Sequence, residues 1–197
     1  MIVSFNFYYA LAGMEDAVLR QRLRASDVRQ NIGIPRGRVL ARVQGAGDLP
    51  DVIWEHSFDD VAGHHADMAV RAASPEFEAI RAGMRKLYRR FERPLFEVCA
   101  TEEQTGSVAA PVGIVKLDWF FCAPDKAAEA LALLGQQAQK GSNGGRLLRL
   151  ITPGNDLPEL VWQQNPIDAA SAEPLQTWPA VVNALAQRVE HSVWKLA

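Results

Sequence analysis

The sequence has few cysteines and no long apolar run. Its two cysteines, Cys99 and Cys122, are too few for a disulfide framework, and they lack the Cys-x-x-Cys spacing of many metal and redox sites. No stretch approaches the ~18 consecutive apolar residues that a membrane-spanning helix requires. The apolar N-terminus has no basic region before it, so we do not expect a secretory signal peptide. These absences predict a soluble protein in the cytoplasm.

A strong excess of one charge is also absent. The chain has 21 basic and 23 acidic residues among 197, with a formal net charge of −2. We therefore expect neither a nucleic-acid partner nor a membrane partner. One local run is basic: Arg85, Lys86, Arg89, Arg90 and Arg93 recur at helical spacing. A solvated helix face is the main interpretation of this run, and a patch that binds an anion or a partner is the alternative.

One segment of the sequence occurs twice. Residues 37–58 match residues 145–166 without a gap, and a repeat of this length indicates two copies of a small domain. We expect a first domain over residues 1–99, a linker over 100–112 and a second, partly degenerate domain over 113–197. Trp54 and Trp162 are expected to be packing residues because both copies keep them. The identical pairs are Gly37/Gly145, Arg38/Arg146, Leu40/Leu148, Asp48/Asp156, Leu49/Leu157, Pro50/Pro158 and Trp54/Trp162.

Each half shows the same order of predicted elements. An alternating aromatic strand comes first, then a segment of helix formers, two strands joined by a turn, a second helical region and a closing strand. This β-α-β-β-α-β order is that of the ferredoxin-like unit, so the predicted fold class is α+β with two tandem ferredoxin-like repeats. The elements are expected over residues 5–9, 14–30, 38–44, 52–58, 59–91 and 94–98, and over residues 117–121, 125–140, 146–152, 160–165, 168–189 and 192–196.

A ferredoxin-like unit leaves one face of its sheet uncovered. Two helices cover the other face, so an apolar uncovered face must be buried against a partner. We expect the two uncovered faces to pack sheet to sheet, ~10 Å apart, as an intrachain α/β barrel. The space between them would be a chamber for a small hydrophobic molecule. Whether the outer surfaces form a homodimer is left open.

Alternation along the first strand of each half separates two rows of side chains. We expect Phe5, Phe7 and Tyr9 to pack in the helix-covered core, because their counterparts in the second half are also bulky and apolar. Asn6 and Tyr8 are then expected to face the chamber. The other residues expected to line it are Asp118 and Phe120, the counterparts of Asn6 and Tyr8, together with Leu40 and Arg42 on the second strand.

Three sequence features together resemble a known group of proteins. They are the strand that ends in residues 52–55 (Val-Ile-Trp-Glu), a histidine early in the following helix (His64 or His65), and the string Ser-Pro-Glu-Phe at residues 74–77. This pattern is similar to that of the dimeric α/β-barrel superfamily, especially its antibiotic-biosynthesis-monooxygenase-like branch. The resemblance covers most of the first half, whereas the second half lacks the histidine and the Ser-Pro-x-Phe string. It implies a small aromatic ligand and cofactor-free oxygenation, isomerisation or cyclisation.

Two sets of residues are candidates for catalysis. His64 and His65 point about 100° apart on a helix, so at most one is expected to face the pocket, where a neutral imidazole could act as a general base. The alternative is an exposed or capping histidine. Asn6 and Tyr8 could donate hydrogen bonds to a developing oxyanion, or simply satisfy buried polar groups.

Arg42 and Glu55 could form an ion pair across neighbouring strands or hold a carboxylated ligand. The spacing of the histidines and acids does not match a usual metal site, so we predict no metal and no cofactor. Two functions remain from the sequence. One is a cofactor-independent monooxygenase or isomerase/cyclase for a hydrophobic aromatic substrate, and the other is a non-catalytic barrel that binds a ligand or a partner.

Overall fold

The computed structural model describes residues 1–101, 113–123, 125–138, 145–152, 156–167, 178 and 180–197. The chain divides into two compact units. Unit 1 comprises Met1–Ala41, Asp48–Leu95 and Ala197, and unit 2 comprises Arg42–Gly47 and Phe96–Leu196. The expected linker lies outside the described residues except for Ala100 and Thr101. None of the helices in the described part of the chain has the length and hydropathy that crossing a membrane requires.

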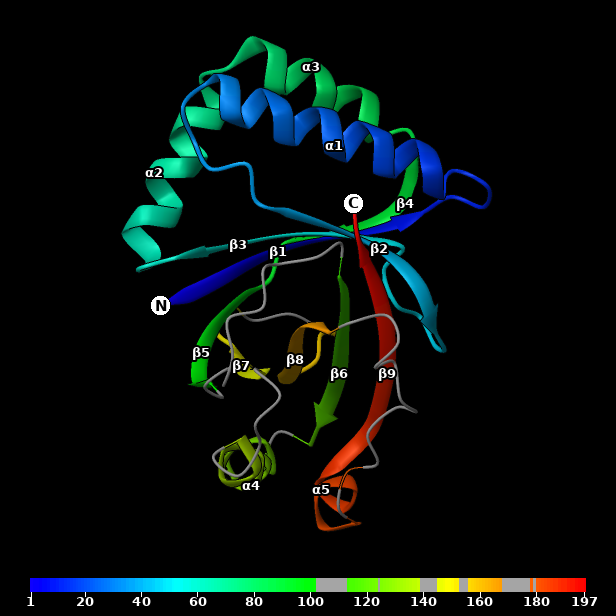
Figure 1. Cartoon of the computed structure of the whole chain (residues 1–197), viewed down its shortest axis with the longest axis vertical. Helices are drawn as coiled ribbons and strands as arrows, with labels where there is room; N and C mark the ends of the chain where they lie inside the picture. Colours follow the sequence, from blue (N-terminus) through cyan, green and yellow to red (C-terminus); the bar gives the residue numbers. More distant parts are fainter. Residues whose placement is uncertain (102–112, 124, 139–144, 153–155, 168–177, 179) are drawn as a thin grey trace. The chain divides into compact units, whose positions relative to one another are not determined.

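Unit 1 is a ferredoxin-like α+β unit, as predicted. Its antiparallel strands follow the order β2-β3-β1-β4. The helices α1 and α3 lie side by side over one face of this sheet (Figure 1). The elements are β1 (Ile2–Ala10), α1 (Glu15–Asn31), β2 (Arg38–Gly45), β3 (Val52–Phe58), α2 (Val61–Ala72), α3 (Pro75–Met84) and β4 (Tyr88–Glu92).

The second helical region that we expected over residues 59–91 contains two helices and most of a strand. Helix α2 begins after Asp60, whose side chain accepts a hydrogen bond from the Gly63 backbone N–H at 2.8 Å. Helix α3 begins after Ser74, which caps it through the Phe77 backbone N–H at 3.2 Å, and Pro75 occupies the first turn. This capping chemistry ends one helix and starts another. The basic run therefore does not form a helix face, because β4 contains Arg89 and Arg90.

The strand expected over residues 94–98 is present as β5 (Leu95–Thr101), but a separate strand, β4, precedes it. Strand β4 pairs with β1 in unit 1, and β5 pairs with β7 in unit 2. The physical reason is Pro94, which has no N–H to donate to a strand ladder. Its carbonyl still accepts a hydrogen bond from the Phe5 N–H at 3.0 Å. At the matching place in the second half, Ser192 allows one strand, β9 (Ala186–Leu196), to continue.

Unit 2 has the same strand order, with one strand added. The order is β9-β6-β8-β7-β5, and every described pairing within it is antiparallel. Part of the second helical region expected over residues 168–189 lies outside the described residues, and its end from Ala186 is strand rather than helix. The further elements are β6 (Ile114–Cys122), α4 (Ala127–Ala138), β7 (Gly145–Leu150), β8 (Leu160–Ile167) and α5 (Ala180–Leu185).

Two identical pairs of the repeat make the same contact in both units. Gly37 has a φ of +71°, and a Cβ added there would lie 2.2 Å from Trp54 Nε1. In unit 2, a Cβ on Gly145 would lie 2.5 Å from the Trp162 ring. Both tryptophans belong to the helix-covered cores, which confirms their expected packing role. Only glycine allows the chain to pass this close to each indole.

The face assignment of β1 was wrong. Tyr8 packs in the core beneath α1 and α3, with Val18 and Phe77, so the row that contains Tyr8 and Asn6 faces the helices. The row that contains Phe5 and Phe7 consequently points to the other face of the sheet. Every residue of β1 is buried, so burial on either face is compatible with bulky side chains. Alternation separates the two rows but does not say which row the helices cover.

The same correction applies to unit 2. Phe120 packs against Leu134 of α4, and Asp118 lies on the same row of β6, so both face the helix side. On β2, Val39 belongs to the helix-covered core of unit 1, and Leu40 is fully buried on the opposite face. A role for Leu40 in ligand binding stays a prediction.

The residue opposite Glu55 in the ladder is Arg38 rather than Arg42. Arg38 Nε donates to Glu55 Oε1 at 2.9 Å, and the equivalent Arg146 Nε in unit 2 donates to Gln163 Oε1 at 2.7 Å. Arg42 itself groups with unit 2.

Candidate functional site

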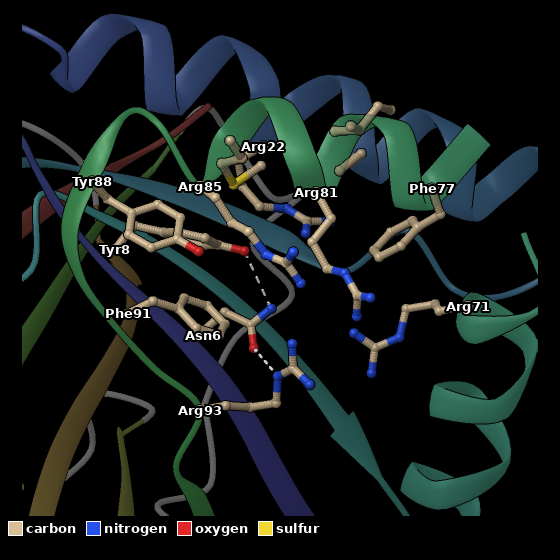
Figure 2. Close-up of a pocket in the computed structure, with 13 residues that line it drawn as sticks. Asn6, Tyr8, Arg22, Arg71, Phe77, Arg81, Arg85, Tyr88, Phe91 and Arg93 are labelled. Carbon is tan, nitrogen blue, oxygen red and sulfur yellow. Dashed lines mark hydrogen bonds between the residues drawn. The ribbon is translucent and has the colours of Figure 1, made fainter. Parts of the chain in front are cut away.

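Unit 1 contains a cavity of about 190 Å³ on the helix-covered side of its sheet (Figure 2). Strand β1 forms its floor, helices α1, α2 and α3 form its walls, and β4 and the residue after it close one side. Asn6 and Tyr8, which we named from the sequence as site residues, both line it. The other lining residues are Arg22, Ala25, Arg71, Phe77, Ile80, Arg81, Met84, Arg85, Tyr88, Phe91 and Arg93.

One end of the cavity is aromatic. The ring centroids of Tyr8 and Phe91 are 5.0 Å apart, those of Tyr88 and Phe91 are 5.6 Å apart, and those of Tyr8 and Tyr88 are 5.8 Å apart. These separations are typical of offset and edge-to-face packing between aromatic rings. A planar ring of a ligand could join this cluster through the same contacts.

The other end of the cavity is rich in guanidinium groups. Figure 2 shows Arg71, Arg81, Arg85 and Arg93 directed into a common space. The Arg93 guanidinium also lies over the Phe91 ring, 5.3 Å from its centroid. Among the described residues, no aspartate or glutamate lines the cavity. The lining is therefore apolar at one end and positively charged at the other.

A chain of hydrogen bonds connects the two ends. Arg93 Nε donates to Asn6 Oδ1 at 3.2 Å, and Asn6 Nδ2 donates to the Tyr8 hydroxyl at 3.4 Å. The positive charge of Arg93 thus polarises the Asn6 amide, which in turn acts on Tyr8. Because the Tyr8 oxygen accepts in this chain, its own hydrogen is available for donation to a ligand.

A buried ion network holds the guanidinium end in place. Asp67 on α2 receives two hydrogen bonds from Arg29 of α1, at 2.6 and 3.1 Å, and its Oδ2 lies 2.8 Å from Arg71 Nε. Arg29 also lies over the Trp54 ring, 4.4 Å from its centroid. Burial lowers the pKa of Arg71 to about 10, while Asp67 opposes the shift, so Arg71 remains charged at neutral pH. Asp67 thus contacts Arg71 at its Nε, while Arg71 lines the cavity.

The structure distinguishes the two adjacent histidines. His64 is buried, with its Nε2 3.5 Å from the Ser4 hydroxyl and its ring in an edge contact with Phe58. Its Nδ1 has no hydrogen-bond partner among the described residues. His65 is exposed. His64 is therefore the histidine that faces inward, although it does not itself line the cavity.

His64 should make stability depend on pH. Burial lowers the pKa of His64, the Arg71 charge acts in the same direction, and Asp67 opposes them. The unfolded state, with a histidine pKa of ~6.5, then binds the proton more readily than the folded state. The contribution of His64 is complete above that value and is lost as the pH falls through the lowered folded-state pKa.

We expect the free energy of unfolding of a His64→Gln variant, measured by urea denaturation, to fall less steeply between about pH 7 and pH 5, by at most ~1.4 kcal/mol per pH unit. His65→Gln is the matched control, because it makes the same change at the neighbouring, exposed position and should flatten the profile less. Identical profiles for the wild type and His64→Gln would contradict this interpretation.

The equivalent place in unit 2 has different chemistry. Asp118 and His191 are opposite each other in the ladder between β6 and β9, and His191 Nδ1 lies 2.7 Å from Asp118 Oδ1. Trp178 Nε1 donates to the other oxygen of Asp118 at 2.9 Å. The bond to Asp118 raises the pKa of His191. Asp118 therefore has protein partners on both of its oxygens.

Sequence reasoning missed most of the arginines of the cavity. Arg22 and Arg71 are isolated in the sequence and come from different helices, so only the fold brings them together. Of the basic run, Arg85 and Arg93 line the cavity, and the alternative interpretation of the run as a patch that binds an anion or a partner stays a prediction. In the described part of the chain, no group of three or more histidines, cysteines or acids is arranged to hold a metal ion.

Comparison with known proteins identifies the fold. No family model and no curated protein matches the sequence. Among solved structures, an anthrone oxidase-like protein superposes with a TM-score of 0.67 at 13% identity, over 100% of this chain and 90% of that one. A protein from Lactobacillus acidophilus, provisionally named a monooxygenase, gives 0.60 at 9% identity over 100% and 92%. A provisionally named monooxygenase from Fusobacterium nucleatum gives 0.60 at 8% identity over 99% and 91%.

These likenesses extend over the whole chain, but identities this low establish the fold alone. The chain therefore has the α+β fold of these three solved structures.

Proposed function

We propose that the cavity of unit 1 binds a small aromatic molecule and promotes its cofactor-independent reaction with O2. The observation that carries this proposal is the hydrogen-bond chain from Arg93 through Asn6 to Tyr8, which ends beside an aromatic cluster. A phenolic ring stacked at the aromatic end would place its oxygen near the Tyr8 hydroxyl. The names of the structural neighbours, an anthrone oxidase-like protein and monooxygenases, support the same class of reaction.

The size of the cavity restricts the substrate. At about 190 Å³ it lies below the ~300–1,000 Å³ typical of sites for drug-sized ligands. This favours a substrate of one or two rings over a tricyclic anthrone.

The electrostatics of the cavity favour an ionised substrate. Positive charges near a phenol lower its pKa, and the lining supplies several guanidinium groups without a carboxylate among the described residues. The phenolate is electron-rich enough to react with O2. One oxygen atom enters the ring as a carbonyl, and the other leaves as water with two hydrogens of the substrate. The Tyr8 hydroxyl stabilises the oxyanion during this step.

His64 is the proposed proton acceptor. Its lowered pKa keeps it neutral at physiological pH, and its Nε2 contacts Ser4, two residues from Asn6 on the same face of β1. The Ser4 hydroxyl would relay the proton between the cavity and the imidazole. Exposed His65 has no part in this scheme.

A suitable substrate for the test is 1,3-dihydroxynaphthalene. Its reaction with O2 gives 2-hydroxy-1,4-naphthoquinone and water, and labelled O2 should introduce one labelled atom into the product. Tyr8→Phe is expected to lower the turnover about 10–100-fold, because it removes an oxyanion donor. Turnover would be followed by product absorbance and mass spectrometry.

Tyr88→Phe is the matched control, since it makes the same chemical change in a residue that lines the cavity but lies outside the hydrogen-bond chain. Its turnover should stay within about twofold of the wild type, because its ring is kept. Equal rates for Tyr8→Phe and the wild type would contradict the proposed role of Tyr8.

A non-catalytic binding protein is the second candidate. The observation that favours it is that no histidine, cysteine or acid among the described residues lines the cavity directly. Calorimetric binding of the naphthol without oxygen uptake would support this function over oxygenation. Absence of binding would contradict both.

A further inference from the structure

We propose that the natural ligand of the unit 1 cavity carries a carboxylate on its aromatic ring, and that Arg71 and Arg93 bind this group. The inference rests on the proposed binding of an aromatic molecule in this cavity, but not on the oxygenation. It names the substrate class as hydroxyaryl carboxylates of one or two rings.

The first argument is the balance of buried charge. Arg22, Arg29 and Arg71 are each at least 94% buried, and Arg93 is partly buried beside them. Asp67 is the carboxylate that contacts members of this group, and both Arg29 and Arg71 share it. Arg22 instead donates to the Ser26 hydroxyl at 3.2 Å, and Arg93 donates to the Asn6 amide. Four guanidinium groups thus share one carboxylate among the described residues.

Such an excess is costly without a counter-charge. Burial of a charged group is expensive unless an opposite charge and hydrogen bonds compensate it. Burial lowers the pKa of Arg22 and of Arg93, and neighbouring arginines contribute to both shifts in the same direction. An anionic ligand would relieve both the desolvation and the mutual repulsion. A neutral phenol would not.

The second argument is the orientation of two of these side chains. Arg71 Nε lies 2.8 Å from Asp67 Oδ2 as an ion pair, although it makes no hydrogen bond among the described residues, and Arg93 Nε donates to Asn6. In each case the protein contact occupies the inner edge of the guanidinium, which leaves the two terminal nitrogens for a ligand. Figure 2 shows the terminal nitrogens of Arg71 and Arg93 turned toward the same space. Paired N–H groups of this kind bind the two oxygens of a carboxylate side by side.

The position of this space relative to the aromatic cluster defines the ligand. Tyr8, Tyr88 and Phe91 lie together, the Arg93 guanidinium lies 5.3 Å from the centroid of the Phe91 ring, and Arg71 lies farther from these rings (Figure 2). A ring stacked on the aromatic side would direct an attached carboxylate toward the two arginines. The hydroxyl next to that carboxylate would then lie near the hydrogen-bond chain of Asn6 and Tyr8.

Calorimetry with a matched pair of ligands tests the inference. The pair is 1-hydroxy-2-naphthoate and its neutral amide, 1-hydroxy-2-naphthamide, which have nearly the same shape. We expect the acid to bind the full-length protein about 10–100-fold more tightly than the amide, with a stronger dependence on salt. Arg93→Met should lower the affinity for the acid about tenfold or more and leave the affinity for the amide within about twofold.

Two further variants complete the test. Arg71→Met should also lower the affinity for the acid and leave the affinity for the amide nearly unchanged. If loss of the Asp67 contact unfolds this variant, Arg93→Met alone still decides the test. Arg89→Met is the matched control, because Arg89 is an exposed arginine of β4 that pairs with Asp48 and does not line the cavity. It should bind both ligands like the wild type.

Three results would overturn the inference: equal affinity for acid and amide, equal losses for both ligands in Arg93→Met, and tighter binding of 1-naphthyl phosphate than of the carboxylate. The test is separable from the proposed oxygenation. Arginine-dependent binding of the acid without oxygen uptake would support the inference and refute the oxygenation. Turnover of 1,3-dihydroxynaphthalene with equal binding of acid and amide would refute the inference and support the oxygenation.

Discussion

Replacing Asp67 with Asn is expected to lower the free energy of unfolding by about 3–5 kcal/mol. The change removes the carboxylate that Arg29 and Arg71 share while both guanidinium groups stay buried. Arg29 keeps its hydrogen bond to the Pro35 carbonyl and its contact with Trp54, but neither partner carries a negative charge. An uncompensated buried charge is among the largest causes of destabilisation by a single substitution. Urea denaturation followed by circular dichroism measures the loss.

Glu78→Gln is the matched control for this prediction. It removes the same kind of partner from an arginine, but the side chains of Glu78 and Arg81 are 48% and 46% exposed. The expected change is within about 0.5 kcal/mol. Hydrogen exchange should locate the effect of Asp67→Asn in helices α1 and α2, which the ion network joins. A loss below about 1 kcal/mol in Asp67→Asn would show that the network does not stabilise unit 1 as described.

Gly37→Ala is expected to lower the free energy of unfolding by about 2–5 kcal/mol. An alanine at a φ of +71° costs ~1–2 kcal/mol in backbone strain. The new methyl group would also lie 2.2 Å from Trp54 Nε1, and relief of that overlap costs a further ~1–3 kcal/mol. The indole cannot simply withdraw, because its Nε1 donates to the Arg36 carbonyl at 3.0 Å and Arg29 covers its face.

Gly33→Ala separates the two contributions. Gly33 has a similar φ of +79°, but a Cβ added there meets no atom within 4 Å. Its variant should therefore show only the backbone cost of ~1–2 kcal/mol. The difference between the two variants measures the contact with Trp54. If both lose the same stability, the close packing of Gly37 on Trp54 is not a constraint on the fold.

These glycine contacts also explain why part of the fold could be predicted. The pairs Gly37/Gly145 and Trp54/Trp162 persist in both halves because each glycine admits the neighbouring indole. Local patterns likewise predicted the strand over residues 52–58, which is β3, and the helix over residues 14–30, which is α1 to within one residue at each end. Adjacent histidines on a helix could be predicted to point apart, and only His64 is buried.

The candidate site was less accessible from the sequence. Asn6 and Tyr8 were found through their alternation, but they were assigned to the wrong face of the sheet. Since β1 is buried along its whole length, polarity and size did not distinguish its two faces. The cavity arginines come from α1, α2, α3 and the chain next to β4, and no spacing connects Arg22, Arg71 and Arg93.

By itself, the sequence determined the first four elements of each half (strand, helix, strand, strand), because capping residues, alternation and turn chemistry act over a few neighbouring positions. The tertiary structure decided which face the helices cover, that β4 pairs with β1, and which arginines meet. These outcomes depend on packing between segments distant in the chain. Pro94, for example, affects strand pairing only because its missing N–H faces a neighbouring strand, whose Phe5 N–H donates to the Pro94 carbonyl.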